Sequence, residues 1–228
     1  MKLGLTIPLL NEADSVTEVV ASTHSILSEA GIDHILVLVN NGSQDQSREV
    51  IESLVVPGMI EAVHLRENVG YGGGILTGLA HLERQGFPEV IGWAWGDGQV
   101  SATAIPPLFQ AIESGADVAK ALRTERHDGP WRQAVTAGYS VTMRTLGVRT
   151  RDINGCPKLM TREAFNAIQP ASADWFLDAE LVLAAERMGM RIEHHPVTMR
   201  RREHGKSNVK ARTLAEFGKN IIAWRLGL

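Results

Sequence analysis

The fold class is decided by residues 34–45, which read HILVLVNNGSQD. Residues 34–39 form a nearly continuous apolar run, as expected for a parallel strand that is buried on both faces of its sheet. Polar residues that favour turns follow this run immediately. A similar run at residues 3–9 opens the chain, and residues 14–30 between the two runs have helical spacing. The order strand, helix, strand predicts an α/β fold built on a parallel sheet.

The same alternation continues along the chain. We expect strands at residues 60–65, 89–95 and 116–120, and helices at residues 45–54, 74–84 and 104–114. The second half is less regular, with helices expected at residues 131–146, 161–168, 174–188 and 211–226 and a strand at residues 191–198. Together these elements predict a mostly parallel sheet with right-handed crossovers and helices on both faces.

The composition is that of an ordinary soluble globular protein, with 44% hydrophobic and 21% charged residues among 228. This length favours one large domain, and two small domains would also fit it. Apolar runs such as residues 35–39 are far too short to cross a bilayer, and the N-terminal residues have no signal-peptide pattern. Cys156 is the only cysteine, which excludes an intrachain disulfide and fits a reducing compartment. We therefore expect a cytoplasmic protein.

Charge is distributed unevenly along the chain, although the net charge is only −3. Residues 1–119 hold 4 Lys or Arg and 15 Asp or Glu, whereas residues 120–228 hold 19 Lys or Arg and 11 Asp or Glu. A basic half beside an acidic half suggests that the C-terminal half meets an anionic partner, and phosphates are the usual candidates. For any single arginine, a solvated helix face is the simpler interpretation.

Four polar clusters follow the four predicted strands of the first half, at residues 11–12, 40–45, 67–74 and 96–99. Such residues also form ordinary turns. However, ligands of open α/β sheets bind at the carboxyl ends of the strands, so four clusters on one rim predict one site. We expect it to bind a nucleotide through the following residues: Pro8, Leu10, Asn11, Glu12, Asn40, Gly42, Asn68, Gly72, Gly96 and Asp97.

Two of these clusters suggest how a diphosphate is held. The glycine-rich segment 70–74 is neither a Walker loop nor a Rossmann fingerprint, but it can bring backbone N–H groups and a helix N-terminus to a phosphate. Asp97 is a carboxylate between two glycines at a predicted strand end. It can reach a divalent cation bound to diphosphate oxygens, and Gln99 can add a neutral oxygen. We expect Mg²⁺ or Mn²⁺ rather than zinc.

The order of these motifs resembles family 2 glycosyltransferases, and especially the dolichol-phosphate-mannose synthase-like branch. The similar segments are residues 7–12, 40–47, 68–78, 95–99 with the prolines at 106–107, 152–158, the helix holding Asp178 and Glu180, and 202–207. They cover residues 3 to about 210. The resemblance implies a GT-A fold, a nucleoside-diphosphate-sugar donor, a divalent metal and inversion at the anomeric carbon.

The chain departs from the family pattern at several positions. Trp95 stands where the metal motif has its first acid, Asn40 and Asn41 stand where the family has an Asp pair, and Asn208 ends a motif that normally ends in lysine. An amide both donates and accepts hydrogen bonds, so the identity of the nucleobase in the donor stays open. Many relatives continue into membrane helices, and this chain stops at Leu228.

The resemblance and the basic half suggest residues for the chemistry. Negative charge on the departing diphosphate needs a metal and cationic side chains, and Arg123 and Arg202 are catalytic candidates. Acceptor or phosphate binding is expected from Arg126, Arg132, Lys158 and Ser207. A phosphate acceptor is already ionised, whereas a hydroxyl acceptor needs a base, for which Asp152, Asp178 and Glu180 are candidates.

Three functions remain open. The first is a glycosyltransferase acting on a polyprenyl phosphate, the second is a soluble enzyme acting on a saccharide or natural-product hydroxyl, and the third is a non-catalytic nucleotide-sugar-binding relative. A nucleotidyltransferase is weaker, because its glycine-rich, lysine-containing loop is missing. We expect no nucleic-acid partner, and the oligomeric state stays open.

One GT-A domain is expected, with a nucleotide-binding half (1–119), an acceptor-binding half (120–210) and an amphipathic helix (211–228). That helix can lie on the inner face of a membrane, dock on a partner or pack on its own domain.

Overall fold

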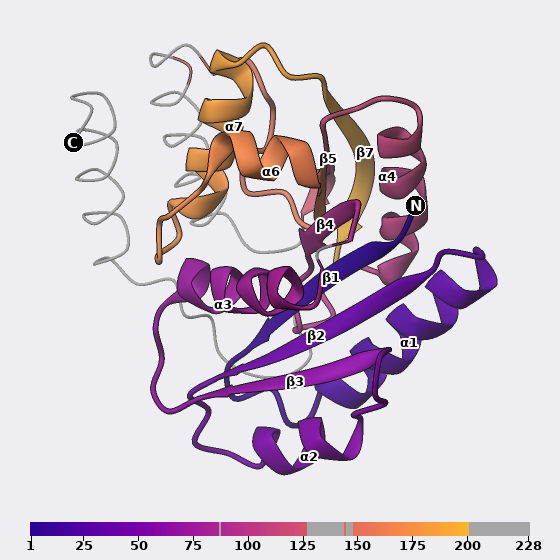
Figure 1. Cartoon of the computed structure of the whole chain (residues 1–228), viewed down its shortest axis with the longest axis vertical. Coiled ribbons are helices and arrows are strands. Elements are labelled where there is room, and N and C mark those ends of the chain that lie inside the picture. Colours follow the sequence, from indigo (N-terminus) through magenta and orange to yellow (C-terminus); the bar gives the residue numbers. More distant parts are fainter. Residues whose placement is uncertain (87, 127–143, 145–147, 201–228) are drawn as a thin grey trace.

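The structure is a computed structural model that describes residues 1–86, 88–126, 144 and 148–200. Its sheet has seven strands in the order β3-β2-β1-β4-β6-β5-β7, and β6 alone among them runs antiparallel to its neighbours (Figure 1). The strands are β1 (Leu3–Leu9), β2 (His34–Asn41), β3 (Ile60–Leu65), β4 (Val90–Trp93), β5 (Val118–Arg126), β6 (Lys158–Thr161) and β7 (Ile192–Met199). The expectation of a mostly parallel sheet is confirmed.

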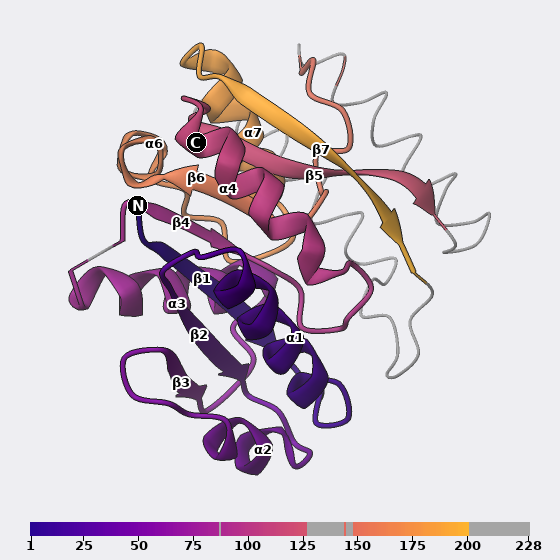
Figure 2. The same cartoon turned by 90° about the vertical axis from the view of Figure 1, so that its right-hand side faces the viewer.

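Helices cover both faces of this sheet, as expected. They are α1 (Val16–Glu29), α2 (Ser47–Ser53), α3 (Tyr71–Arg84), α4 (Ile105–Glu113), α6 (Arg162–Ile168) and α7 (Leu177–Arg187), with a short 3-10 turn, η1 (Ala102–Ala104). Side chains of α1, α2 and α4 pack on one face, and those of α3, α6 and α7 pack on the other. Figure 2 shows α1 and α4 in front of the strands.

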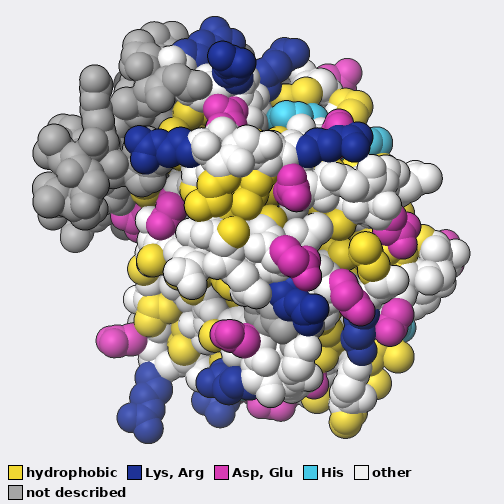
Figure 3. Space-filling view, turned by 45° about the horizontal axis from the view of Figure 1, so that its top comes forward, with side chains coloured by type: hydrophobic (Ala, Val, Ile, Leu, Met, Phe, Trp, Pro, Cys, Tyr) yellow, Lys and Arg dark blue, Asp and Glu magenta, His cyan; other side chains and the backbone are white. Residues whose placement is uncertain are grey.

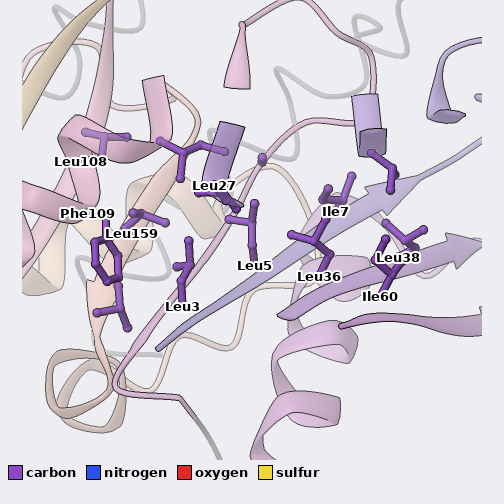
Figure 4. Close-up of a cluster of buried hydrophobic side chains, with 14 of the residues drawn as sticks. Leu3, Leu5, Ile7, Leu27, Leu36, Leu38, Ile60, Leu108, Phe109 and Leu159 are labelled. Carbon is purple, nitrogen blue, oxygen red and sulfur yellow. The ribbon is translucent and has the colours of Figure 1, made fainter. Parts of the chain in front are cut away.

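The core of the first face shows why these segments form these elements. Alternate residues of β1, such as Leu3, Leu5 and Ile7, point to the same side and meet Leu27 of α1 and Leu108 of α4 (Figure 4). The other residues of each central strand face α3 and α7, so every residue of β2 is buried. Burial on both faces explains the continuous apolar run that identified this strand.

The structure corrects several boundaries. The helix expected from residue 74 begins at Tyr71, so the glycines form its first turn. Strand β5 extends to Arg126, six residues beyond the expected end. Strand β6 was not expected, because a four-residue strand has too few positions to show a period. The helices expected at residues 131–146 and 211–226 lie outside the described residues.

Candidate functional site

The carboxyl ends of β1 and β2 are joined by their own polar side chains. Asn11 has a left-handed backbone (φ 56), and its Oδ1 accepts a hydrogen bond from Gln44 N (2.8 Å). Asn11 N in turn donates to Ser43 Oγ (3.0 Å). Glu12 N donates to Ser47 Oγ (3.0 Å). The first two predicted clusters therefore form one network on the rim.

The end of β4 joins the same network through Ser15. Its Oγ lies 3.0 Å from Glu12 Oε2 and 3.1 Å from the carbonyl oxygen of Gly96. Since β4 pairs with β1, Gly96 and Asp97 emerge beside the Asn11–Glu12 turn. Pro8, Asn40 and Gly42 belong to the ends of the two paired strands β1 and β2. The structure thus brings the expected nucleotide-site residues of strands one, two and four to one rim.

Asn40 and Asn41 use both ends of their amides inside the protein. Asn40 Oδ1 accepts from Ser43 N (3.0 Å), and its Nδ2 lies 3.2 Å from His64 Nδ1. Asn41 Nδ2 donates to Gly70 O (2.8 Å), while its Oδ1 accepts from Val69 N (3.0 Å). A carboxylate at residue 41 could not make the first of these two bonds. At this residue, where the family has an acid, the amide thus makes a bond that a carboxylate cannot make.

The glycine-rich segment packs closely against the loop at 172–174. A Cβ at Gly70 would overlap the carbonyl oxygen of Ala173, and one at Gly72 would overlap that of Ser172. The N–H of Gly73 donates to Ala173 O (2.8 Å). These glycines thus allow the first turn of α3 to approach a neighbouring loop. Asn68 Oδ1 accepts from Gly70 N (2.8 Å) and supports the same turn. Phosphate binding by Gly72 stays a prediction.

Asp97 and Gln99, the expected metal ligands, lie in the loop after β4. Asp97 is half-buried, and its Oδ1 accepts from Gln99 N (3.1 Å), which fixes the turn between them. Gln99 is buried and ties this loop to the end of β7. Its side-chain Nε2 donates to Arg200 O (3.0 Å), and its backbone carbonyl oxygen accepts from Arg200 N (2.8 Å). The side-chain oxygen Oε1 is then the atom of Gln99 that can bind a cation. No group of three metal-binding His, Cys, Asp or Glu side chains occurs among the described residues. A lone hard carboxylate fits a cation whose other ligands are diphosphate oxygens.

Arg123 and Asp152 are bound to each other. The carboxylate of Asp152 accepts from Arg123 N (2.8 Å), Nε (3.0 Å) and Nη2 (2.5 Å). Burial alone would raise the pKa of Asp152, but its bonds to Arg123 outweigh burial and hold this pKa below its usual value. These bonds make Asp152 a weaker proton acceptor, and its role as a general base stays a prediction. Asp152 also offsets the charge of Arg123, and the catalytic role expected of Arg123 stays a prediction.

Lys158 and Asp178 form a second internal pair. Lys158 is fully buried and Asp178 is 1% exposed, and Lys158 Nζ donates to Asp178 Oδ1 (2.5 Å). Phosphate binding by Lys158 and base catalysis by Asp178 stay predictions, since in this structure the two groups are bound to each other. Glu180 also has an internal role, because its carboxylate accepts from the N–H groups of Ala171 and Ser172.

Some expected residues cannot be placed. Arg132, Arg202 and Ser207 lie outside the described residues, as does the side chain of Arg126. On the face shown in Figure 3, basic and acidic side chains of the described surface are interspersed.

An aromatic cluster beside Asp97 was missed by sequence reasoning. Trp95 Nε1 donates to Tyr71 Oη (3.1 Å), and the Tyr71 ring stacks on Trp175 with centroids 4.4 Å apart. The guanidinium of Arg123 lies 5.5 Å from the centroid of the Trp95 ring. Burial raises the pKa of Tyr71 well above its usual value. Tyr71, Trp95 and Trp175 are far apart in sequence, so no local pattern predicted that they would meet.

The seven-stranded, mostly parallel sheet with helices on both faces has the GT-A fold of the solved structures that it matches. Among solved structures, glucosyl-3-phosphoglycerate synthase from Mycobacterium tuberculosis is similar, with TM-score 0.71 and 17% identity over 99% of this chain and 79% of that one. The same enzyme in complex with Mn²⁺ and uridine-diphosphate-glucose gives TM-score 0.70 and 18% identity over 99% and 78% of the two chains. TarS from S. aureus gives TM-score 0.62 and 15% identity over 87% and 60%.

The chain belongs to glycosyl transferase family 2, whose family model matches residues 5–169. Its curated relatives include the undecaprenyl-phosphate 4-deoxy-4-formamido-L-arabinose transferase of Edwardsiella ictaluri, 28% identical over 209 residues. That match covers 90% of this chain and 62% of the relative. The enzyme of the same name from Pseudomonas fluorescens is 26% identical over 223 residues, which is 96% of this chain and 64% of the relative. The chain thus spans less than two thirds of the length of these relatives.

Proposed function

We propose that this protein is a glycosyltransferase that moves a sugar from a nucleoside-diphosphate sugar to a polyprenyl phosphate with inversion. The choice of acceptor rests on one observation: each of the three candidate general bases is bound to another group of the protein. Asp152 is bound to Arg123, Asp178 to Lys158, and Glu180 to the backbone at residues 171–172. A hydroxyl acceptor would need a base, whereas a phosphate acceptor is already ionised. The names of the curated relatives support the same acceptor class.

The rim supplies the donor site. We assign the nucleotide to the joined ends of β1, β2 and β4, where Pro8, Leu10 and Asn40 border the base and ribose. Asp97, with the amide oxygen of Gln99, would hold a divalent cation, Mg²⁺ or Mn²⁺, on the diphosphate oxygens. When bound, that cation would stabilise the negative charge of the departing diphosphate. An acceptor phosphate oxygen bonds to the anomeric carbon as the bond from that carbon to the diphosphate breaks, and the diphosphate leaves with the bonding electrons.

Turnover with a panel of nucleotide sugars tests this function. The purified chain is incubated with Mn²⁺, each labelled donor and undecaprenyl phosphate in detergent, and the label in the organic extract is measured. Label in the extract that requires the lipid phosphate supports the proposal. Transfer only to a water-soluble saccharide would replace it with the second function. Saturable nucleotide binding without any transfer would indicate a non-catalytic relative. The reason to consider this function is that Asn40 and Trp95 stand where the family has acids.

We further propose that the reaction takes place at the inner face of a membrane. No helix among the described residues is long and apolar enough to cross a bilayer. The basic residues 200–202 and the predicted amphipathic helix at 211–228 would supply the contact with anionic lipid. Flotation with liposomes that contain anionic phospholipid tests this; a full-length chain that stays at the bottom of the gradient contradicts it.

A further inference from the structure

A fully buried lysine, Lys120 of β5, bonds to backbone carbonyl groups rather than to a carboxylate. Its Nζ donates to Asp152 O (2.6 Å), Ala121 O (3.1 Å) and Arg151 O (3.2 Å). Three acceptors match the three N–H groups of an ammonium, and a neutral amine has only two. The geometry of these contacts therefore fits the charged form of Lys120.

The turn that Lys120 holds is the turn that holds Arg123. Asp152 has a left-handed backbone (φ 48), which is strained for a residue other than glycine. Its carboxylate makes the bonds to the backbone and guanidinium of Arg123. The guanidinium then lies over Trp95, two residues before Asp97. One chain of contacts thus leads from the buried ammonium to the loop that carries the expected metal ligand.

We propose that Lys120 is a positioning residue that acts through Asp152 and Arg123 to place Trp95 and the Asp97 loop for catalysis. The proposal rests on the function proposed above. Loss of one N–H from Lys120 would release one carbonyl group of the turn and loosen Asp152, although Lys120 itself touches no substrate.

The surroundings of Lys120 make this role depend on pH. The charged and titratable groups that face it are Lys158 of β6, Asp178 of α7, Asp152 in the turn, Arg123 of β5 and His194 of β7. Burial, and next the charge of Lys158, lower the pKa of Lys120 from 10.5 to about 7. Deprotonation above this pH relieves the cost of burying a charge, but it removes the third N–H. Activity should fall with rising pH while this residue's contribution to stability rises.

Because activity and stability should change in opposite directions with pH, the pH profile distinguishes a positioning role from a merely structural one. For the full-length wild type, we expect kcat to fall about tenfold between pH 6.5 and 8.5 with little change in donor KM, since small displacements in a site cost rate more than binding. Lys120→Met should have the low kcat throughout and no transition near pH 7. The control His194→Gln alters the neighbouring titratable group in the same row of the sheet and should keep the wild-type profile.

A second measurement needs neither turnover nor a folded Lys120→Met variant. The tryptophan fluorescence of the wild type is titrated from pH 6 to 9 and compared with that of Trp95→Phe, which isolates the signal of Trp95. A transition near pH 7 that is present in wild type and absent in Trp95→Phe supports the proposal even if no donor is turned over. A flat fluorescence difference overturns it, as does a kcat profile of Lys120→Met parallel to that of wild type.

Discussion

The two halves of the sheet hold their polar groups in opposite ways. At the ends of β1, β2 and β4, uncharged side chains bond to backbone groups on the rim, as Asn11 and Asn41 do. Under α7, charged side chains are buried in pairs, as Lys158 and Asp178 are. The rim network combines such amides with the carboxylates of Glu12 and Asp97, whereas the buried pairs fix the interior at the cost of desolvation. The difference predicts that removing the Asp97 charge from the rim affects activity, whereas breaking the buried pair under α7 affects stability.

The largest effect should come from breaking the buried pair. Lys158→Met leaves the carboxylate of Asp178 buried without its cation, which should lower the free energy of unfolding by about 3–5 kcal/mol in urea titrations. Arg191→Met is the matched control, because it removes an ion pair with Glu193 that is about half exposed and should cost less than about 1 kcal/mol. Equal losses from the two variants would contradict the distinction between the halves.

Asp97→Asn should have the converse effect at the rim. The amide oxygen can still accept from Gln99 N, so we expect an unchanged unfolding midpoint. Turnover should fall about 100- to 1,000-fold, because a hard anionic ligand for the cation is lost. By calorimetry, Mn²⁺ and nucleotide should no longer strengthen each other's binding, an effect that is reciprocal in wild type.

Asp14→Asn removes the same charge from an exposed position after β1 and should leave both readouts unchanged. Full activity of Asp97→Asn in EDTA would exclude the metal role of Asp97.

The rim and the region under α7 also differ in how well sequence predicts them. The apolar runs of β1 and β2 and the polar residues after them follow from local patterns, so the mostly parallel sheet and the polar clusters at its rim were predictable. The charged residues were not, because pairing partners such as Arg123 and Asp152 are 29 positions apart. A buried lysine and a surface lysine cannot be told apart in a sequence unless the pairing partner of the buried one is known. The sequence therefore did not show that Lys158 and Asp178 bind each other.

Asn41 sharpens this contrast, because it tests whether the family's acid was lost for structural reasons. Asn41→Asp keeps the acceptor for Val69 N but faces the carbonyl oxygen of Gly70 without a hydrogen. We expect a loss of about 1–3 kcal/mol in the free energy of unfolding. Asn68→Asp is the control. Asn68 Oδ1 accepts a hydrogen bond from Gly70 N, and a carboxylate at this position can accept the same bond. A stabilised Asn41→Asp protein would mean that the amide was selected for the ligand instead.

The smallest effect concerns the pH dependence of stability under α7. Lys120 has a pKa of about 7 in the folded protein and 10.5 as its ordinary value, so the unfolded chain binds more protons between these values. Stability from this group therefore rises as pH increases through 7 and levels off above 10.5. Between pH 6.5 and 8, the free energy of unfolding of wild type should gain about 1 kcal/mol relative to Lys120→Met, measured in parallel urea titrations. The comparison with the variant removes contributions from the other titrating groups, including the histidines. A difference that shrinks with rising pH would mean that the folded state prefers the charged lysine, and the three carbonyl contacts would then outweigh the cost of burial.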